Sequence, residues 1–140
     1  MYEYTTLTQP HLIRVLELRP TWKRDADLVI RLLEVSIEKP PIFDALSYAW
    51  ESQSLDQTIS CDGETLLISA TCKAALFRLR QKTRRRLLWI NQICINQTSM
   101  EEKNHQVAIM GEIYSRARRT VVWLGVSPIS DELLWHGQPI

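Results

Sequence analysis

The sequence predicts an α/β fold, with a mixed or mostly parallel sheet flanked by helices. Three observations lead to this prediction. Apolar runs of strand length, rich in β-branched residues, recur along the chain. Two further segments repeat apolar residues at helical spacing instead. The order strand, helix, strand over residues 85–125 indicates a right-handed parallel crossover.

The first half of the chain supplies strands and a turn. Residues 12–18 (LIRVLEL) form the first predicted strand, and Pro20 follows it. Residues 28–37 form a second strand with apolar side chains on both faces, so we expect it to be well buried. Pro40 and Pro41 end it. Residues 43–52 are expected to form a short strand that enters a loop.

The middle of the chain predicts a hairpin followed by a helix. Residues 57–69 contain two apolar runs that flank Asp62-Gly63, a strong signal for a tight hairpin turn. The next segment, 70–82, has a helical apolar stripe, and Ser69 or Thr71 is a suitable N-cap.

Residues 85–125 form the centre of the predicted fold. A continuous apolar run within 85–91 is typical of a strand buried on both faces. A polar loop, a helix over 100–117 and a second buried strand over 119–125 follow. We divide the chain into a domain at 1–125 and a tail at 126–140. The tail is expected to begin a further helix, as the start of a truncated C-terminal region.

Length and charge limit the function classes. The 140 residues suit one domain, and the 45% hydrophobic and 24% charged contents are ordinary for a globular protein. The formal net charge of +1 gives no field that favours nucleic acid or an anionic membrane. Two basic clusters, Arg84-Arg85-Arg86 and Arg116-Arg118-Arg119, are interpreted as solvated ends of strands and a helix.

The cysteines and the N-terminus indicate an intracellular, cytoplasmic protein. Three cysteines that are far apart in sequence argue against a disulfide framework and against a metal site. The first residues lack the basic and apolar regions of a signal peptide. No apolar run approaches the ~20 residues that a membrane span requires. We therefore expect no metal, no membrane and no nucleic acid as partners.

Unusual side chains gather where the 85–91 strand ends and the 100–117 helix begins, and any chemistry is expected there. They are Trp89, Asn91, Cys94, Asn96, Gln97, Glu102 and Gln106. Each also has a structural interpretation. Ser99 and Glu102 fit a capping box, and a buried Gln106 would need only a hydrogen-bond partner. Cys94, in an apolar context, is expected to be inert.

Several motifs resemble the fungal heterokaryon incompatibility (HET) domain. They are ALSYAW at 45–50, LLWINQICINQ at 87–97, the segment from Glu102 to Tyr114, and VVWLG at 121–125. The resemblance covers roughly residues 12–125. It implies a role in fungal non-self recognition and programmed cell death signalling, with partners among the other incompatibility proteins and self-association.

The HET family is also thought to be distantly similar to Toll/interleukin-receptor (TIR) domains, some of which hydrolyse NAD. This similarity implies a TIR-like three-layer architecture with an inserted β-hairpin. It makes Glu102 the candidate catalytic residue of an NAD glycohydrolase, with NAD as substrate and no bound cofactor. The ligand-binding candidates are Tyr48, Trp50, Trp89, Asn91, Asn96, Gln97 and Gln106. Tyr48 and Trp50 have packing as their structural alternative.

The sequence departs from the HET pattern at four positions. Glu51 replaces a Gly, Asn91 replaces an Asp, Thr98 replaces an acidic residue and Lys103 replaces an Arg. Three hypotheses therefore stay open. The chain is an incompatibility signalling domain, an NAD-cleaving enzyme, or a non-catalytic interaction module or diverged inactive copy.

Overall fold

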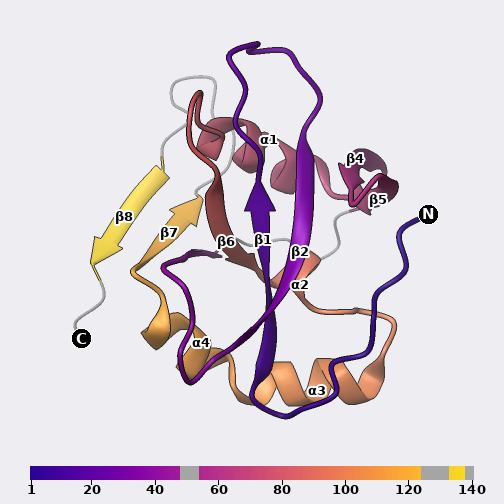
Figure 1. Cartoon of the computed structure of the whole chain (residues 1–140), viewed down its shortest axis with the longest axis vertical. Helices are drawn as coiled ribbons and strands as arrows, with labels where there is room; N and C mark the ends of the chain where they lie inside the picture. The colour runs from indigo at the N-terminus through magenta and orange to yellow at the C-terminus, as the bar shows by residue number, and fades with distance from the viewer. Residues whose placement is uncertain (48–53, 124–132, 138–140) are drawn as a thin grey trace.

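A computed structural model describes residues 1–47, 54–123 and 133–137, and within them one mixed sheet carries helices (Figure 1). The strands are β1 Leu12–Leu18, β2 Val29–Ser36, β3 Asp44–Ser47, β4 Gln57–Cys61, β5 Glu64–Ile68, β6 Arg86–Ile90, β7 Arg119–Trp123 and β8 Leu133–Gly137. The helices are α1 Ala70–Leu79, α2 Asn91–Cys94, α3 Met100–Ala108 and α4 Met110–Arg116.

The sheet has the strand order β5-β4-β2-β1-β6-β3-β7-β8. Pairs β2–β4, β3–β6 and β3–β7 are parallel, whereas β1–β2, β1–β6, β4–β5 and β7–β8 are antiparallel. The α/β class and the mixed sheet are thus confirmed, and the alternative of a mostly parallel sheet is wrong. The predicted crossover joins the parallel strands β6 and β7, but β3 lies between them.

Helices contact both faces of the sheet at β6. Because side chains alternate along a strand, Arg86 and Trp89 point to opposite faces. The Arg86 guanidinium donates to the carbonyl oxygen of Leu79 in α1, at 3.1 Å. The Trp89 ring packs edge-on against Tyr114 of α4, with centroids 5.6 Å apart. Two layers of helices therefore enclose the middle of the sheet.

Burial differs between the first two strands. In β1 the residues from Ile13 to Leu18 are all buried, as a central strand requires. The prediction that β2 is well buried is wrong, because Arg31 and Glu34 are exposed and most other positions are half-buried. The strand pairing explains this. Strand β4 pairs with β2 only at Val29 and Ile30, so the rest of β2 is an edge of the sheet and is less covered.

The predicted hairpin and helix start are both confirmed. Asp62 and Gly63 have φ angles of 51° and 81°, which two-residue hairpin turns of the favoured type require. Ser69 caps α1, since its hydroxyl oxygen accepts a hydrogen bond from the Cys72 amide at 3.1 Å. Gln92 then ties α2 to this cap, because its Oε1 accepts from the Ser69 amide at 2.8 Å.

Three other expectations need correction. The turn after β6 is not a polar loop throughout, because α2 forms one buried helical turn there. The helix expected over 100–117 bends at Ile109, where ψ is 7° and α3 gives way to α4. The tail was expected to begin a helix, but residues 133–137 form β8, antiparallel to β7. No helix in the described ranges is both long and apolar enough to span a bilayer.

Candidate functional site

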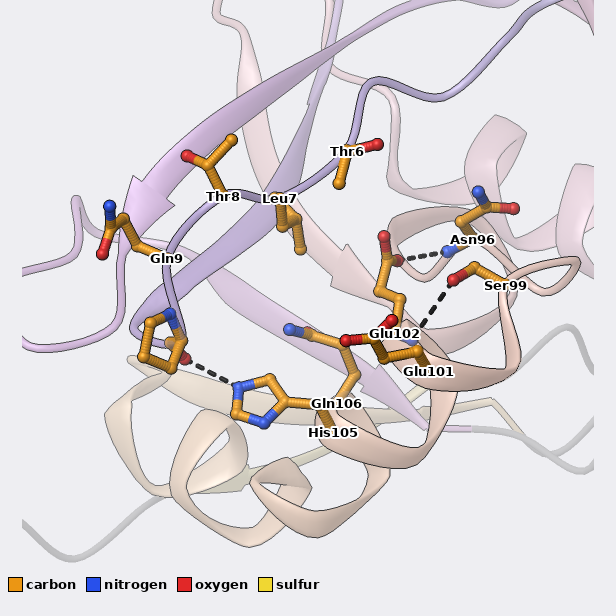
Figure 2. A pocket seen from close by; sticks show the side chains of 11 residues that line it. Thr6, Leu7, Thr8, Gln9, Asn96, Ser99, Glu101, Glu102, His105 and Gln106 are labelled. Carbon is orange, nitrogen blue, oxygen red and sulfur yellow. Dashed lines mark hydrogen bonds between the residues drawn. The ribbon is translucent and has the colours of Figure 1, made fainter.

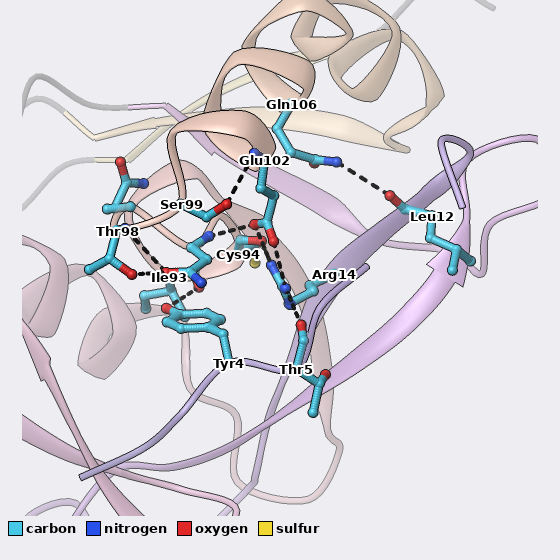
Figure 3. Close-up of polar contacts among 12 residues, drawn as sticks. Tyr4, Thr5, Leu12, Arg14, Ile93, Cys94, Thr98, Ser99, Glu102 and Gln106 are labelled. Carbon is cyan, nitrogen blue, oxygen red and sulfur yellow. Dashed lines mark hydrogen bonds and ion pairs between the residues drawn. The ribbon is translucent and has the colours of Figure 1, made fainter. Parts of the chain in front are cut away.

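A buried ion pair lies at the centre of the predicted site. Arg14 of β1 and Glu102 of α3 form two parallel hydrogen bonds, from Nη1 to Oε2 at 2.6 Å and from Nη2 to Oε1 at 2.8 Å (Figure 3). The Arg14 side chain is 1% exposed and the Glu102 side chain 11% exposed. Such a two-pronged geometry is the strongest arrangement that these side chains offer.

Backbone groups complete the coordination of both charges. The amide of Asn96 donates to Glu102 Oε2 at 2.6 Å. Arg14 donates from Nη2 to the carbonyl oxygen of Thr5 at 2.6 Å and from Nη1 to that of Cys94 at 3.2 Å. We call Arg14, Glu102 and these three backbone groups the clasp. It joins β1, the N-terminal segment, the turn after α2 and the first turn of α3.

The surroundings of Arg14 in the clasp favour its charged form. Burial alone would lower the pKa of Arg14, but the hydrogen bonds and charge of Glu102 outweigh it and raise that pKa above its ordinary value. The guanidinium carbon also lies 5.0 Å from the centre of the Tyr4 ring. The Tyr4 hydroxyl in turn donates to the carbonyl oxygen of Ile93 at 2.7 Å.

The predicted capping box is only half present. The Ser99 hydroxyl accepts from the Glu102 amide at 3.2 Å, as an N-cap does. The Glu102 carboxylate does not return to the Ser99 amide, which instead donates to the carbonyl oxygen of Asn96. Arg14 and Asn96 hold the carboxylate, so Glu102 links separate elements and does more than cap its own helix.

A pocket of about 400 Å³ opens beside the clasp (Figure 2). Its walls are the N-terminal segment 6–10 on one side and the start of α3 with the preceding turn on the other. Three of the predicted site residues, Asn96, Glu102 and Gln106, line it together. Its volume lies within the range of small-molecule pockets.

Gln106 is the most deeply buried polar residue of the pocket wall. It is 0% exposed, and its Nε2 donates to the carbonyl oxygen of Leu12 at 3.3 Å. Its Oε1 has no hydrogen-bond partner among the described residues. His105, its neighbour, places Nε2 at 2.8 Å from the carbonyl oxygen of Pro10. The hydrogen-bond partner that a buried Gln106 needs is thus supplied by β1.

Three other predicted ligand-binding residues, Trp89, Asn91 and Gln97, do not line this pocket. Trp89 is 0% exposed and belongs to the core, so it is not a stacking surface for a ligand. Gln97 Nε2 donates to the Asn91 carbonyl oxygen at 2.9 Å, and this pair stabilises the turn around α2. Tyr48 and Trp50 lie outside the described residues.

Cys94 is unsuited to nucleophilic chemistry, as the sequence predicted. It is 0% exposed, and burial raises the pKa of its thiol to about 12. Its sulfur accepts a hydrogen bond from the Ile90 amide at 3.4 Å. Elsewhere in the described ranges, no three His, Cys, Asp or Glu side chains gather closely enough to hold a metal ion.

Arg14 is the site residue that sequence reasoning missed. The signal was present, because an arginine in the middle of the apolar run LIRVLEL must be either exposed or paired. A strand buried on both faces excludes exposure, and a buried charge requires a partner of opposite sign. The sequence alone did not identify Glu102, 88 residues away, as that partner.

Comparison with known proteins agrees with the geometry and motifs. The heterokaryon incompatibility protein (HET) family matches residues 43–137. Heterokaryon incompatibility protein 6, OR allele, of Neurospora crassa is 37% identical over an alignment 138 positions long, and the match covers 89% of this chain and 20% of that protein. The chain therefore spans about a fifth of the length of this relative. No solved structure matches the chain significantly, so the TIR-like architecture stays a prediction. The chain belongs to the heterokaryon incompatibility (HET) family.

Proposed function

We propose that this chain is the signalling domain of a protein that acts in fungal heterokaryon incompatibility, where it promotes cell death after non-self recognition in the cytoplasm. The family match over 43–137 carries the proposal. The identity of 37% to an incompatibility protein supports it. The relative is about five times longer than the matched part, so sensing of the non-self partner is assigned to regions outside such a domain.

Within this proposal, Glu102 has a structural role. Both of its carboxylate oxygens accept hydrogen bonds from Arg14, and Oε2 also accepts from the Asn96 amide. Both oxygens are therefore already engaged, and reorientation of the carboxylate toward a substrate would leave the guanidinium of Arg14 buried and uncompensated. The clasp thus supports a domain that signals without catalysis. Such a domain acts through contacts that its folded surface makes with other proteins or with further copies of itself.

NAD cleavage is the second candidate function. The observation that favours it is the pocket of about 400 Å³, where Glu102 lies beside Asn96 and the unpartnered Oε1 of Gln106. In such a reaction a carboxylate would stabilise positive charge that develops on the ribose. The burial of Trp89 counts against it, because Trp89 is then lost as one of the predicted aromatic contacts to the substrate.

The proposal is tested by inducible expression of the 140-residue chain in a filamentous fungus, with growth and membrane integrity as the measurements. We expect growth arrest in cells that express the chain. Chain that accumulates in folded form without any effect on growth would overturn the proposal.

The same cells separate the two candidates through their NAD content. The purified chain is also incubated with NAD, and nicotinamide release is followed. Growth arrest without loss of NAD supports the signalling function. Nicotinamide release that depends on Glu102 supports the enzyme.

A further inference from the structure

The two basic clusters of the sequence meet at one end of the sheet. Asp44, the first residue of β3, lies between β6 and β7 and is 1% exposed. Its carboxylate pairs with Arg86 at 3.3 Å, with Arg118 at 3.0 Å and with Arg119 at 3.5 Å. The interpretation of the clusters as solvated ends is wrong for Arg86, whose side chain is 13% exposed, whereas the side chains of Arg118 and Arg119 are 52% and 38% exposed. All three are gathered around one carboxylate.

A pocket of about 410 Å³ lies over this point. The charged residues of its lining are one acidic residue, Asp44, and four arginines, Arg84, Arg85, Arg86 and Arg118. The remaining lining is apolar or neutral and includes Ile42, whose side chain is 74% exposed. Even with Glu17, which pairs with Arg85, two negative charges face four positive charges, so the pocket carries excess positive charge.

The outer arginines are accessible to a ligand. The side chains of Arg85 and Arg118 are 60% and 52% exposed. Arg85 pairs with Glu17 and Arg118 with Asp44. Arg84 is exposed and makes no ion pair or hydrogen bond with any other residue that the structure describes. Since the whole chain has a formal charge of only +1, this concentration of charge is local.

We propose that the pocket formed by Arg84, Arg85, Arg86 and Arg118 around Asp44 binds a small anion that carries more than one phosphate group. Guanidinium forks match the geometry of phosphate oxygens, and several forks converge here. The volume exceeds what a single phosphate needs and suits a small ligand. The phosphate groups belong either to a free metabolite or to a lipid headgroup, and this site is separate from the pocket beside the clasp.

Titration calorimetry of the complete 140-residue chain with inorganic tripolyphosphate tests the proposal. We expect saturable binding that weakens as salt is added. Arg84→Gln should weaken it about tenfold, because a hydrogen bond to a charged group is lost. Ile42→Glu, which adds a carboxylate to the exposed rim, should weaken it at least as much. Both positions are exposed, so both variants should fold.

Arg78→Gln is the matched control, because Arg78 is an exposed arginine of α1 outside the pocket. Its affinity for tripolyphosphate should equal that of the unmodified chain. Co-sedimentation with phosphatidylcholine vesicles, with and without phosphatidylinositol 4-phosphate, distinguishes a lipid headgroup from a free ligand. Binding to either probe that requires Arg84 supports the site. Absence of binding to both probes, or an equal loss in Arg78→Gln, would overturn it.

Discussion

Replacement of Glu102 by Gln should destabilise the domain far more than its place in the first turn of a helix suggests. The substitution keeps the shape of the side chain but removes its charge. The carboxylate accepts from three donors, Arg14 Nη1, Arg14 Nη2 and the Asn96 amide. The amide nitrogen of a glutamine cannot accept, so at least one donor would lose its partner.

The magnitude follows from burial. With Arg14 1% exposed, loss of the opposite charge leaves a guanidinium that water cannot reach. Removal of one partner from a buried ion pair costs about 3–5 kcal/mol. Typical domains have only about 5–15 kcal/mol of stability, so the midpoint of urea unfolding should fall substantially.

Glu101→Gln is the matched control for this measurement. Glu101 is the adjacent residue in the first turn of α3 and is exposed, so its loss removes only a favourable helix-dipole contact. That contact is worth about 0.3–1 kcal/mol. Equal unfolding free energies for the Glu101 and Glu102 variants would refute the structural role of the clasp.

The double substitution Arg14→Met with Glu102→Leu removes both charges together. Apolar replacement of a complete buried pair is often neutral or stabilising. The double variant should therefore unfold at a higher urea concentration than Glu102→Gln. This variant also lacks the carboxylate, so it separates the fold from any chemistry of Glu102.

Three further substitutions or labelling experiments have simpler outcomes. Burial raises the pKa of the Cys61 and Cys94 thiols to about 12, so both stay protonated at pH 8. Because the thiolate is the reactive form, both should react with a disulfide reagent only after unfolding. Fast labelling of the native chain would contradict this. Gly63→Ala should lower the free energy of unfolding in urea by about 1–2 kcal/mol, because an alanine is strained at the φ angle of +81° that this position has. The space around Gly63 is open, so no steric clash adds to this cost. Ser69→Ala should cost about 1–2 kcal/mol through the lost cap of α1, whereas Thr71→Ala should not.

The local elements were largely predictable from the sequence. The hairpin at Asp62-Gly63 and the cap at Ser69 depend on turn and capping chemistry within a few residues; the hairpin was predicted, and Ser69 was one of the two predicted caps. The bend at Ile109 and the strand β8 were not, because they depend on packing and on pairing with β7. The burial of β2 was overestimated for the same reason, since edge position is a property of the whole sheet.

The candidate site was predicted in part. Glu102, Gln106 and Asn96 do line one pocket, because they are close in sequence at the start of one helix. Arg14 was missed because its partner, Glu102, is distant in the chain. The positions of charged residues in a sequence do not show which of them pair in the folded protein. The arginines around Asp44 were missed likewise, since three strands bring them together.

The most direct test of the proposed function is growth of a filamentous fungus that expresses the Arg14→Met, Glu102→Leu double variant beside the unmodified chain. If the domain signals through its fold, with Glu102 as part of the clasp, both proteins should arrest growth to the same extent. Circular dichroism and urea unfolding of the purified double variant establish that it is folded. A folded double variant that leaves growth unaffected, while the unmodified chain arrests it, would contradict this account and make the carboxylate itself essential.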